Sequence, residues 1–312
     1  MALSFLSRKA RVVTITIEED AIRHVDLKSS LPIELNCAEE IFLPAGIIEE
    51  GKIVDAAALA SELDKAVNQW GLSKKSVRFL APDEFVIIRK VPYPEDVEAD
   101  ELKGHFFIEI GSTLYLPFED PVFDVVPYHP EEEQPEAIII ASKESVVKSY
   151  EDVFDQVKLK AIVADITPLA LYRLGYLQHD FQEDEHIMLI DLQSKKMTVS
   201  IFHEHFPMFM RPVDLEIEDP LLADRSAVME TIEIEVEKLA NFYRYNMNSG
   251  EEGITKVVCN GEFYDWQAFQ QSLEMRFQIP IQPLVLDVIP CGDEKDVSRR
   301  FNRAIGLALK EV

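Results

Sequence analysis

The chain has 312 residues, 47% of them hydrophobic and 28% charged, so it is long enough for two packed lobes and is unlike a disordered or fibrous polymer. Its 57 acidic residues against 31 basic ones give a formal net charge of −26, which argues against a nucleic-acid partner. The three cysteines are widely spaced and form no Cys-x-x-Cys pair, which favours a reduced, cytoplasmic setting.

The first eleven residues place apolar side chains before basic ones: Leu3, Phe5 and Leu6 precede Arg8, Lys9 and Arg11. This segment is too short for a signal peptide or a membrane-spanning helix. Two interpretations stay open. The segment is either a weak foot on an anionic membrane surface or an ordinary frayed terminus.

The first third of the chain alternates strand and helix signals. Three β-type stretches predict a meander: 12–17, 22–27 and 31–36. Asp55 is an N-cap candidate for a helix that Gly71 ends. Two further strands, 76–81 and 85–91, are separated by a turn-like Pro-Asp-Glu.

A small layered module is predicted before a charged linker. A helix over 96–110 and a strand over 122–128 follow the strands just described. Counted from the strand near residue 41, the order is βαββαβ, and residues 130–135 form the linker that ends it.

The remainder alternates strands with helices. Predicted strands are 137–141, 161–165, 187–192, 197–202, 206–211, 256–261 and 280–286. Predicted helices are 143–157, a short one after Thr167-Pro168, 226–247, one through Trp266 and one through 301–309. The polar stretch 179–186 is expected to be an exposed hinge.

No nucleotide-binding, nucleophile or zinc-protease motif is found. His203 and His205 alternate on a predicted strand and so point to one face, as a metal pair or as the polar face of a hairpin. The second interpretation is favoured because no third ligand is evident. The acidic runs 131–133 and 216–219 are interpreted as solvated, so neither a catalytic residue nor a metal site is assigned.

Six segments together resemble PilM, the FtsA-like, actin-fold family of type IV pilus assembly. They are 41–63, 77–94, 106–128, 164–175, 188–202 and 303–310. Each is weak alone, but their order and spacing are specific, and they cover nearly the whole chain.

The resemblance implies an α/β, actin-like (ribonuclease H-like) fold in two lobes with an inserted βαββαβ module. Residues 1–36 and 131–178 would form the first lobe, with the C-terminal helix 298–312 packed back on it. Residues 37–130 would form the module and 179–297 the second lobe. The chain lacks most of the helical stretch that the family carries between Arg211 and Ser226, so the fourth subdomain should be small or absent.

The family would hold ATP in the interlobe cleft by two tight hairpins rich in glycine and small hydroxyl residues, each with one aspartate for magnesium. The first hairpin reads roughly Asp-Ile-Gly-Ser-Ser in the family, but here Thr16, Ile17, Glu18, Glu19 and Asp20 stand in its place. Three carboxylates there would oppose a triphosphate by several kcal/mol. A metal site that works with nucleotide is the other interpretation of these carboxylates, and a solvated turn is the ordinary one.

The other nucleotide elements are partly kept. The second hairpin retains Asp191 and Thr198 but has Gln193 in place of glycine, and the adenine-side loop keeps only Gly261 after Asn260. We therefore expect a degenerate nucleotide site and a pseudo-ATPase with no cofactor; ATP and magnesium belong to the alternative below.

By resemblance, the chain is expected to be a cytoplasmic scaffold of a type IV pilus or competence-type machine, peripheral at the inner face of the cell membrane. It would bind the cytoplasmic N-terminal tail of a PilN-like inner-membrane protein and communicate with pilus ATPases. A groove between the first lobe and the module would take this tail, and its candidate lining is Tyr115, Leu116, Pro117 and Phe118. Core packing explains these four residues equally well.

Two other functions remain open at this point. One is an ATP-binding, polymer-forming protein like FtsA, favoured by Asp191, Thr198 and Gly261 and opposed by Thr16 and Glu18. The other is a structural protein of cell division.

Overall fold

The computed structural model describes residues 12–129, 134–215, 225–261, 265–292 and 297–311. The expected membrane foot, the centre of the charged linker, the acidic run 216–219 and most of the stretch where a fourth subdomain would begin lie outside these ranges. The chain divides into unit 1 (Met1–Glu84, Ser145–Leu174 and Val288–Val312) and unit 2 (Phe85–Glu144 and Gly175–Asp287).

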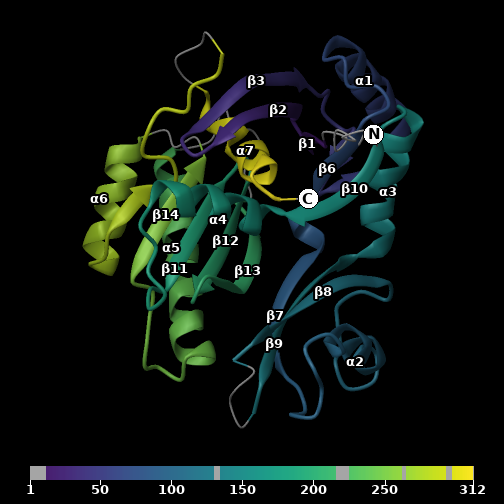
Figure 1. The fold of residues 1–312 in the computed structure, drawn as a ribbon. Helices are drawn as coiled ribbons and strands as arrows, with labels where there is room; N and C mark the ends of the chain where they lie inside the picture. The colour runs from purple at the N-terminus through teal and green to yellow at the C-terminus, as the bar shows by residue number, and fades with distance from the viewer. Residues whose placement is uncertain (1–11, 130–133, 216–224, 262–264, 293–296, 312) are drawn as a thin grey trace, which may run out of the picture. The chain divides into compact units, whose positions relative to one another are not determined.

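Unit 1 is built on a five-stranded mixed sheet in the order β10-β6-β1-β2-β3 (Figure 1). The strands β1, β2 and β3 form the predicted antiparallel meander, and β6 and β10 add to it in parallel. The bounds are β1 Val13–Ile17, β2 Ala21–Ser30, β3 Ile33–Phe42, β6 Ser76–Ala81 and β10 Lys160–Ile166, with a small hairpin of β4 Ile48–Glu49 and β5 Lys52–Ile53.

The helices of unit 1 begin and end where local chemistry predicts. Asp55 accepts a hydrogen bond from the Ala58 amide at 2.9 Å and so caps α1, and Gly71 follows the helix at a φ of +66°, which favours glycine. The bounds are α1 Ala56–Gln69, α3 Glu144–Gln156, α4 Thr167–Gln178, η3 Arg299–Phe301 and α7 Asn302–Ala308. α4 begins in unit 1 and ends in unit 2.

The C-terminal helix α7 lies against β1 and β2 of unit 1, on the lobe where the sequence analysis placed it (Figure 1). Arg78 of β6 donates to three carbonyl oxygens at the C-terminal end of α7. They are those of Leu307 at 3.4 Å, Ala308 at 3.2 Å, and Lys310. The last carbonyls of a helix have no partner within the helix, so this guanidinium satisfies them.

A buried histidine lies in the sheet of unit 1. Nδ1 of His24 donates to the Thr14 carbonyl at 2.8 Å, and the ring stacks on Trp70 with centroids 5.6 Å apart. Burial lowers the pKa of His24 below its ordinary 6.5, because the charged ring would lose its hydration. The folded protein therefore holds this ring neutral.

Unit 1 should accordingly lose stability in mild acid. A group with a lowered folded-state pKa contributes its full stability above the unfolded-state pKa of 6.5 and loses it as the pH falls toward the folded-state value. The slope for one proton is at most about 1.4 kcal/mol per pH unit. Urea unfolding followed by Trp70 fluorescence at pH 7.5 and 5.5, with Trp266 replaced by phenylalanine, measures this loss. It should be smaller in His24→Gln, and an equal loss in both proteins would contradict the assignment.

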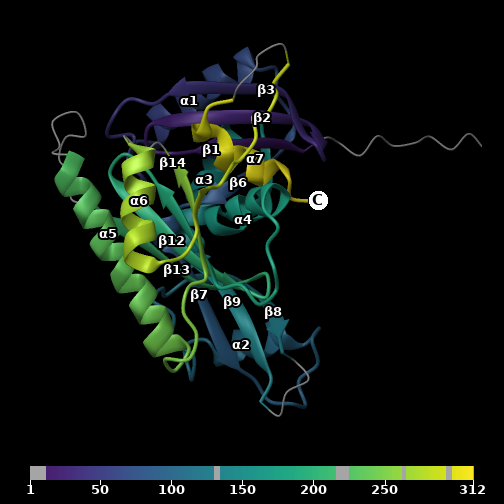
Figure 2. The ribbon, with the colours of Figure 1, turned by 90° about the vertical axis from the view of Figure 1, so that its left-hand side faces the viewer.

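Unit 2 contains a second five-stranded sheet in the order β13-β12-β11-β14-β15, antiparallel over β11 to β13 and parallel over β11, β14 and β15. Figure 2 shows α5 and α6 on one face of it. The bounds are β11 Ile187–Leu192, β12 Lys196–His203, β13 Phe206–Asp214, α5 Arg225–Phe242 with a π-helical turn Tyr243–Met247, β14 Lys256–Gly261, α6 Trp266–Phe277 and β15 Ile281–Pro283.

Unit 2 also contains a three-stranded antiparallel sheet, in the order β7-β9-β8, packed on α2. The bounds are β7 Val86–Pro92, α2 Leu102–Glu109, β8 Pro121–Tyr128 and β9 Glu136–Lys143, and η1 Asp83–Phe85 precedes β7. Leu102 and Phe106 of α2 are buried in one cluster with Ala137, Ile139 and Ala141 of β9.

Strand pairing departs from the expected module of residues 37–130. β6 lies between β1 and β10 in unit 1, so β6 and β7 belong to different sheets although only four residues separate them. β9, which was expected in the first lobe, is the central strand beside β7 and β8. The segment from 288 onward, expected in part in the second lobe, lies in unit 1, where Cys291 pairs with Leu35. The expected boundaries were wrong because local sequence patterns indicate where strands lie but not which strands pair with one another.

Three smaller expectations also need correction. The stretch 179–186 is not exposed throughout, because His179, Phe181 and His186 are buried. The helix expected over 96–110 is limited to α2, and the strand expected over 280–286 to β15. The ambiguous stretch 232–237 is helical, as predicted from its length and lack of turn residues.

Candidate functional site

The first candidate hairpin is the β1–β2 turn of unit 1. The Glu18 amide donates to the Ala21 carbonyl at 2.9 Å, which closes a turn over Glu19 and Asp20. The side chain of Glu18 is largely buried, whereas that of Asp20 is mostly exposed. The expectation of a wholly solvated turn is therefore wrong for Glu18.

Arg23 of β2 binds three carboxylates around this turn. Its guanidinium nitrogens lie 2.8 Å from Glu18 Oε1, 3.0 Å from Asp20 Oδ2 and 2.6 Å from Glu40 Oε2. The arginine side chain is only 3% exposed. Burial disfavours its charge, but the surrounding carboxylates outweigh that effect and raise the pKa of Arg23 above its ordinary value.

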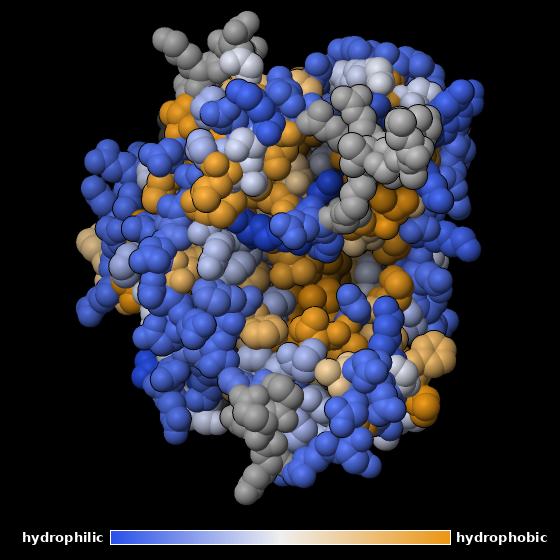
Figure 3. Space-filling model, in the orientation of Figure 1, coloured by the Kyte–Doolittle hydropathy of each residue, from blue (hydrophilic) through white to orange (hydrophobic). Residues whose placement is uncertain are grey.

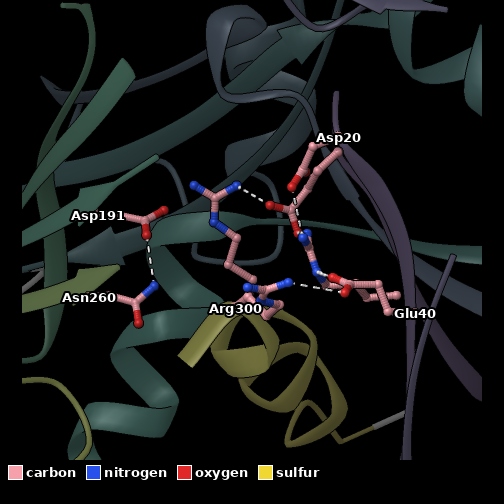
Figure 4. Close-up of polar contacts among 8 residues, drawn as sticks. Asp20, Glu40, Asp191, Asn260 and Arg300 are labelled. Carbon is pink, nitrogen blue, oxygen red and sulfur yellow. Dashed lines mark hydrogen bonds and ion pairs between the residues drawn. The ribbon is translucent and has the colours of Figure 1, made fainter. Parts of the chain in front are cut away.

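Two arginines from the C-terminal segment complete the network. Arg303 Nη1 lies 3.0 Å from Glu18 Oε2, and Arg300 Nη1 lies 3.2 Å from Glu40 Oε1 (Figure 4). Three carboxylates at this turn were expected to oppose a triphosphate, without any account of nearby cations. The structure adds those cations, because Glu18 of the turn and Glu40 of β3 are each held by two guanidinium groups.

By the resemblance given above, Thr16 was expected at the position of a metal-facing aspartate. Its side chain is 1% exposed, and its hydroxyl has no hydrogen-bond partner within the described ranges. Arg23 lies directly opposite it on β2. An uncharged, buried hydroxyl supplies no carboxylate ligand for a hard cation.

The second candidate hairpin joins β11 to β12 in unit 2. Asp191 lies in the sheet between Thr198 of β12 and Asn260 of β14, and all three side chains are buried. Asn260 Nδ2 donates to Asp191 Oδ1 at 2.8 Å (Figure 4). The sheet therefore brings together three of the residues singled out in the sequence, on neighbouring strands.

The loops at this end of the sheet are tight. The Gln193 amide donates to the Lys196 carbonyl at 2.8 Å and closes the hairpin. Gly261 has a φ of +118°, and a Cβ there would lie 2.3 Å from the Leu192 carbonyl oxygen. Glycine is required at this position by both its backbone conformation and the close approach of β11.

A comparison with known proteins places the chain. The family model described as type IV pilus assembly protein PilM matches residues 14–215, more than half of the sequence. The chain belongs to the PilM family. No curated protein matches it.

Solved structures agree with this family in fold. The chain is similar to one in the "PilM-PilN type IV pilus biogenesis complex", with a TM-score of 0.73 and 18% identity over 96% of this chain and 97% of that one. At a TM-score of 0.50 it is similar to a Bacteroides thetaiotaomicron protein with an actin-like ATPase fold and unknown function (9% identity; 99% and 100% covered). The same TM-score relates it to the cytoplasmic domain of EpsL, an inner-membrane component of the Vibrio cholerae type II secretion system (11% identity; 96% and 96% covered). The fold is that of actin-like proteins.

The four residues expected to line a partner groove, 115–118, differ in how far they are exposed. Tyr115 is 69% exposed and Pro117 is exposed, whereas Leu116 packs against the core of the small sheet and Phe118 is half-buried. Arg89 Nη1 donates to the Tyr115 carbonyl at 2.8 Å and fixes the backbone there. Tyr115 and Pro117 are therefore the two of these residues that can meet a partner directly.

His203 and His205 do not lie on one face of a strand, contrary to the sequence prediction. Glu204 and His205 form the β12–β13 turn, with φ of +50° and +64°, so His203 and His205 do not share a strand face. The His203 ring stacks on buried His186 at 4.0 Å, and burial lowers the pKa of His203. His186 contacts the Tyr243 hydroxyl and Glu252, each at 2.7 Å. Over the described ranges, no cluster of three or more potential ligands could hold a metal ion.

Sequence reasoning missed the arginine network in the PilM-family chain. Arg23 and Glu40 are direct cross-strand partners, and Arg23 follows Asp20 by three residues, so a meander of β1 to β3 carries part of the signal. Arg300 and Arg303 come from the far end of the chain, and no local pattern relates them to Glu18 or Glu40.

Within the described ranges, no helix is long and apolar enough to cross a membrane.

Proposed function

We propose that this chain is a cytoplasmic scaffold of a type IV pilus or competence-type assembly machine. It binds the cytoplasmic N-terminal tail of a PilN-like inner-membrane protein, lies peripherally at the inner face of the membrane through that partner, and does not act as an ATPase. The observation that carries the proposal is the PilM family match together with the likeness, over nearly the full length of both chains, to a PilM–PilN complex.

A degenerate nucleotide site is part of the proposal. Triphosphates are bound by free N–H donors and cations, but Arg23 and Arg303 direct their guanidinium groups to Glu18. A phosphate at this turn would have to displace these ion pairs and bring like charge against the largely buried Glu18 carboxylate. The first hairpin thus does not fit ATP with magnesium, and the proposed protein works without a cofactor.

The alternative is an ATP-binding, FtsA-like protein that forms polymers. The buried Asp191 beside Thr198, with Gly261 close to Leu192, favours it, because these residues would suit a magnesium-bound phosphate. Asn260 holds one oxygen of this carboxylate, which weighs against a full ligand role.

Magnesium-ATP should leave the thermal stability unchanged. A ligand present at about 100 times its Kd stabilises the folded state by about 2.7 kcal/mol, which would raise Tm by several degrees. We expect a shift below about 1 °C at 5 mM magnesium-ATP, measured by differential scanning fluorimetry. A saturable shift that disappears in Asp191→Asn would support the alternative.

The partner tail should bind through charge and a few apolar contacts. The acidic chain, with a net charge of −26, attracts a tail with basic residues, and exposed tyrosines are frequent binding hot spots. A fluorescein-labelled synthetic peptide of the cognate PilN-like N-terminal tail should bind in fluorescence anisotropy, more weakly at high salt. Tyr115→Ala should raise Kd about tenfold, equivalent to about 1.4 kcal/mol.

A matched control tests whether the loss of affinity is specific to Tyr115 or follows from removing any exposed tyrosine. Tyr245 is exposed to a similar degree in the middle of the π-helical turn that follows α5, so Tyr245→Ala should leave the Kd within twofold. No tail binding by the wild-type protein would contradict the scaffold proposal. Equal binding by both variants would instead reject Tyr115 as the contact.

A further inference from the structure

The helix α2 carries large apolar side chains on two sides. Leu102 and Phe106 are buried against the small sheet, whereas Phe107 and Ile108 are 75% and 74% exposed. Gly104 lies on the same side as Phe107 and Ile108, because residues three and four apart are neighbours on a helix. We call Gly104, Phe107 and Ile108 the α2 outer face.

The fold itself does not use this face. The buried side of α2 is complete with Leu102 and Phe106, and a Cβ added at Gly104 would meet nothing within 4 Å. Figure 3 shows orange, apolar atoms over the α2 region at the lower right of the molecule, bordered by hydrophilic residues. An apolar patch with a polar rim is typical of an interaction surface.

The charge around α2 restricts what can cover it. Residues 93–124 contain nine acidic residues and one lysine. The exposed acidic side chains of this segment are those of Glu95, Asp96, Glu98, Asp100, Glu101, Glu119 and Asp124. Anionic lipid would be repelled, and so would a second copy of this chain, whose net charge is −26. A cationic occupant is favoured.

We propose that the α2 outer face docks a basic amphipathic helix of a protein partner. Apolar residues of that helix, spaced by three and four, would pack against Phe107 and Ile108, and flanking lysine or arginine side chains would meet the acidic rim. Gly104 leaves room for the partner's backbone to approach. This proposal does not depend on the tail contact at Tyr115, which lies in the stretch between α2 and β8.

The test uses a defined probe on the full chain. A fluorescein-labelled, 18-residue helical peptide of leucine and lysine, with its leucines on one face, is titrated in fluorescence anisotropy. Its scrambled version has the same composition but no apolar face. The double variant Phe107→Ser/Ile108→Ser should raise the Kd for the amphipathic peptide at least tenfold, and the scrambled peptide should bind at least tenfold more weakly to the wild type.

Two further variants control for general effects. Met275 on α6 is 76% exposed, so Met275→Ser should leave the Kd within twofold. Glu98→Lys/Glu101→Lys changes only exposed residues of the rim and should weaken binding at least fivefold. Because their side chains are exposed, Phe107→Ser/Ile108→Ser and Met275→Ser should melt close to the wild type. Glu98→Lys/Glu101→Lys places cations at the N-terminus of α2 and should melt slightly lower, so its peptide binding is measured well below its Tm.

Several results would overturn the proposal. Equal binding of the two peptides, or an unchanged Kd in Phe107→Ser/Ile108→Ser, would mean that only net charge attracts the peptide. Binding to phosphatidylglycerol vesicles that is lost in the double variant would make a membrane the occupant. Dimerisation in analytical ultracentrifugation that is lost in the same variant would make it a second copy of this chain.

Discussion

Gly306→Ala is expected to destabilise unit 1 by about 1 to 3 kcal/mol, the usual cost of forcing atoms into a packed interior. A Cβ at Gly306 would lie 2.0 Å from the Ala170 carbonyl oxygen, which belongs to the α4 backbone and cannot rotate away. Ala170 and Leu307 form one buried cluster with Leu80. The substitution therefore separates α7 from α4 or distorts both.

The sign of this effect is informative. Alanine in place of glycine normally stabilises a helix by up to about 1 kcal/mol, so a loss must come from packing. Gly104→Ala in α2 is the matched control, because its new Cβ meets nothing within 4 Å, and it should be neutral or stabilising.

Urea unfolding followed by far-ultraviolet circular dichroism measures both variants. Trp70 fluorescence, with Trp266 replaced by phenylalanine, then reports on unit 1 in Gly306→Ala. A Gly306→Ala protein as stable as the parent would show that α7 and α4 are not so closely packed.

Arg23→Met is expected to have the largest effect, a loss of about 3 to 5 kcal/mol, which is typical when one partner of a buried ion pair is removed. The substitution removes the charge that lies within 3.0 Å of Glu18, Asp20 and Glu40. Arg303 and Arg300 still hold two of these carboxylates, but from one side only. The buried negative charge is then under-compensated.

Two comparisons test this explanation. Lys65→Met removes an exposed ion pair with Glu62 and should cost at most about 1 kcal/mol. Adding Glu18→Gln to Arg23→Met should restore part of the lost stability, because it removes one of the uncompensated charges. If the double variant is no more stable than Arg23→Met in urea unfolding at pH 7, loss of packing rather than charge explains the effect.

The sequence predicted the elements of this fold better than their partners. Short runs rich in β-branched and apolar residues located β1 and β11, helical spacing located α1, and capping chemistry at Asp55 and Gly71 located the ends of α1. These signals arise from neighbouring residues. Parallel pairing of β6 with β1 and β10 depends on side chains far apart in the chain, so the sequence patterns assigned β6 to the wrong sheet.

For the candidate site, too, the sequence predicted individual residues better than their distant partners. Asp191, Thr198 and Asn260 were identified through the resemblance to the family's segments, and the sheet brings them together. The acidic turn was also identified, but its charge was misjudged because Arg300 and Arg303 follow Glu18 by more than 280 residues. An isolated acidic motif says nothing about cations supplied from elsewhere in the fold.

Unit 1 is assembled from three stretches of chain, and Val288–Val312 is synthesised after the other two. Until it emerges, β1 and β2 lack the helix that covers them, and the guanidinium of Arg78 has no carbonyls to bind. Nascent chains of this protein therefore expose an incomplete unit 1 core until this stretch has been made, which makes them prone to aggregation at that stage. A stalled or prematurely terminated product is left without its closing helix and becomes a substrate for proteolysis.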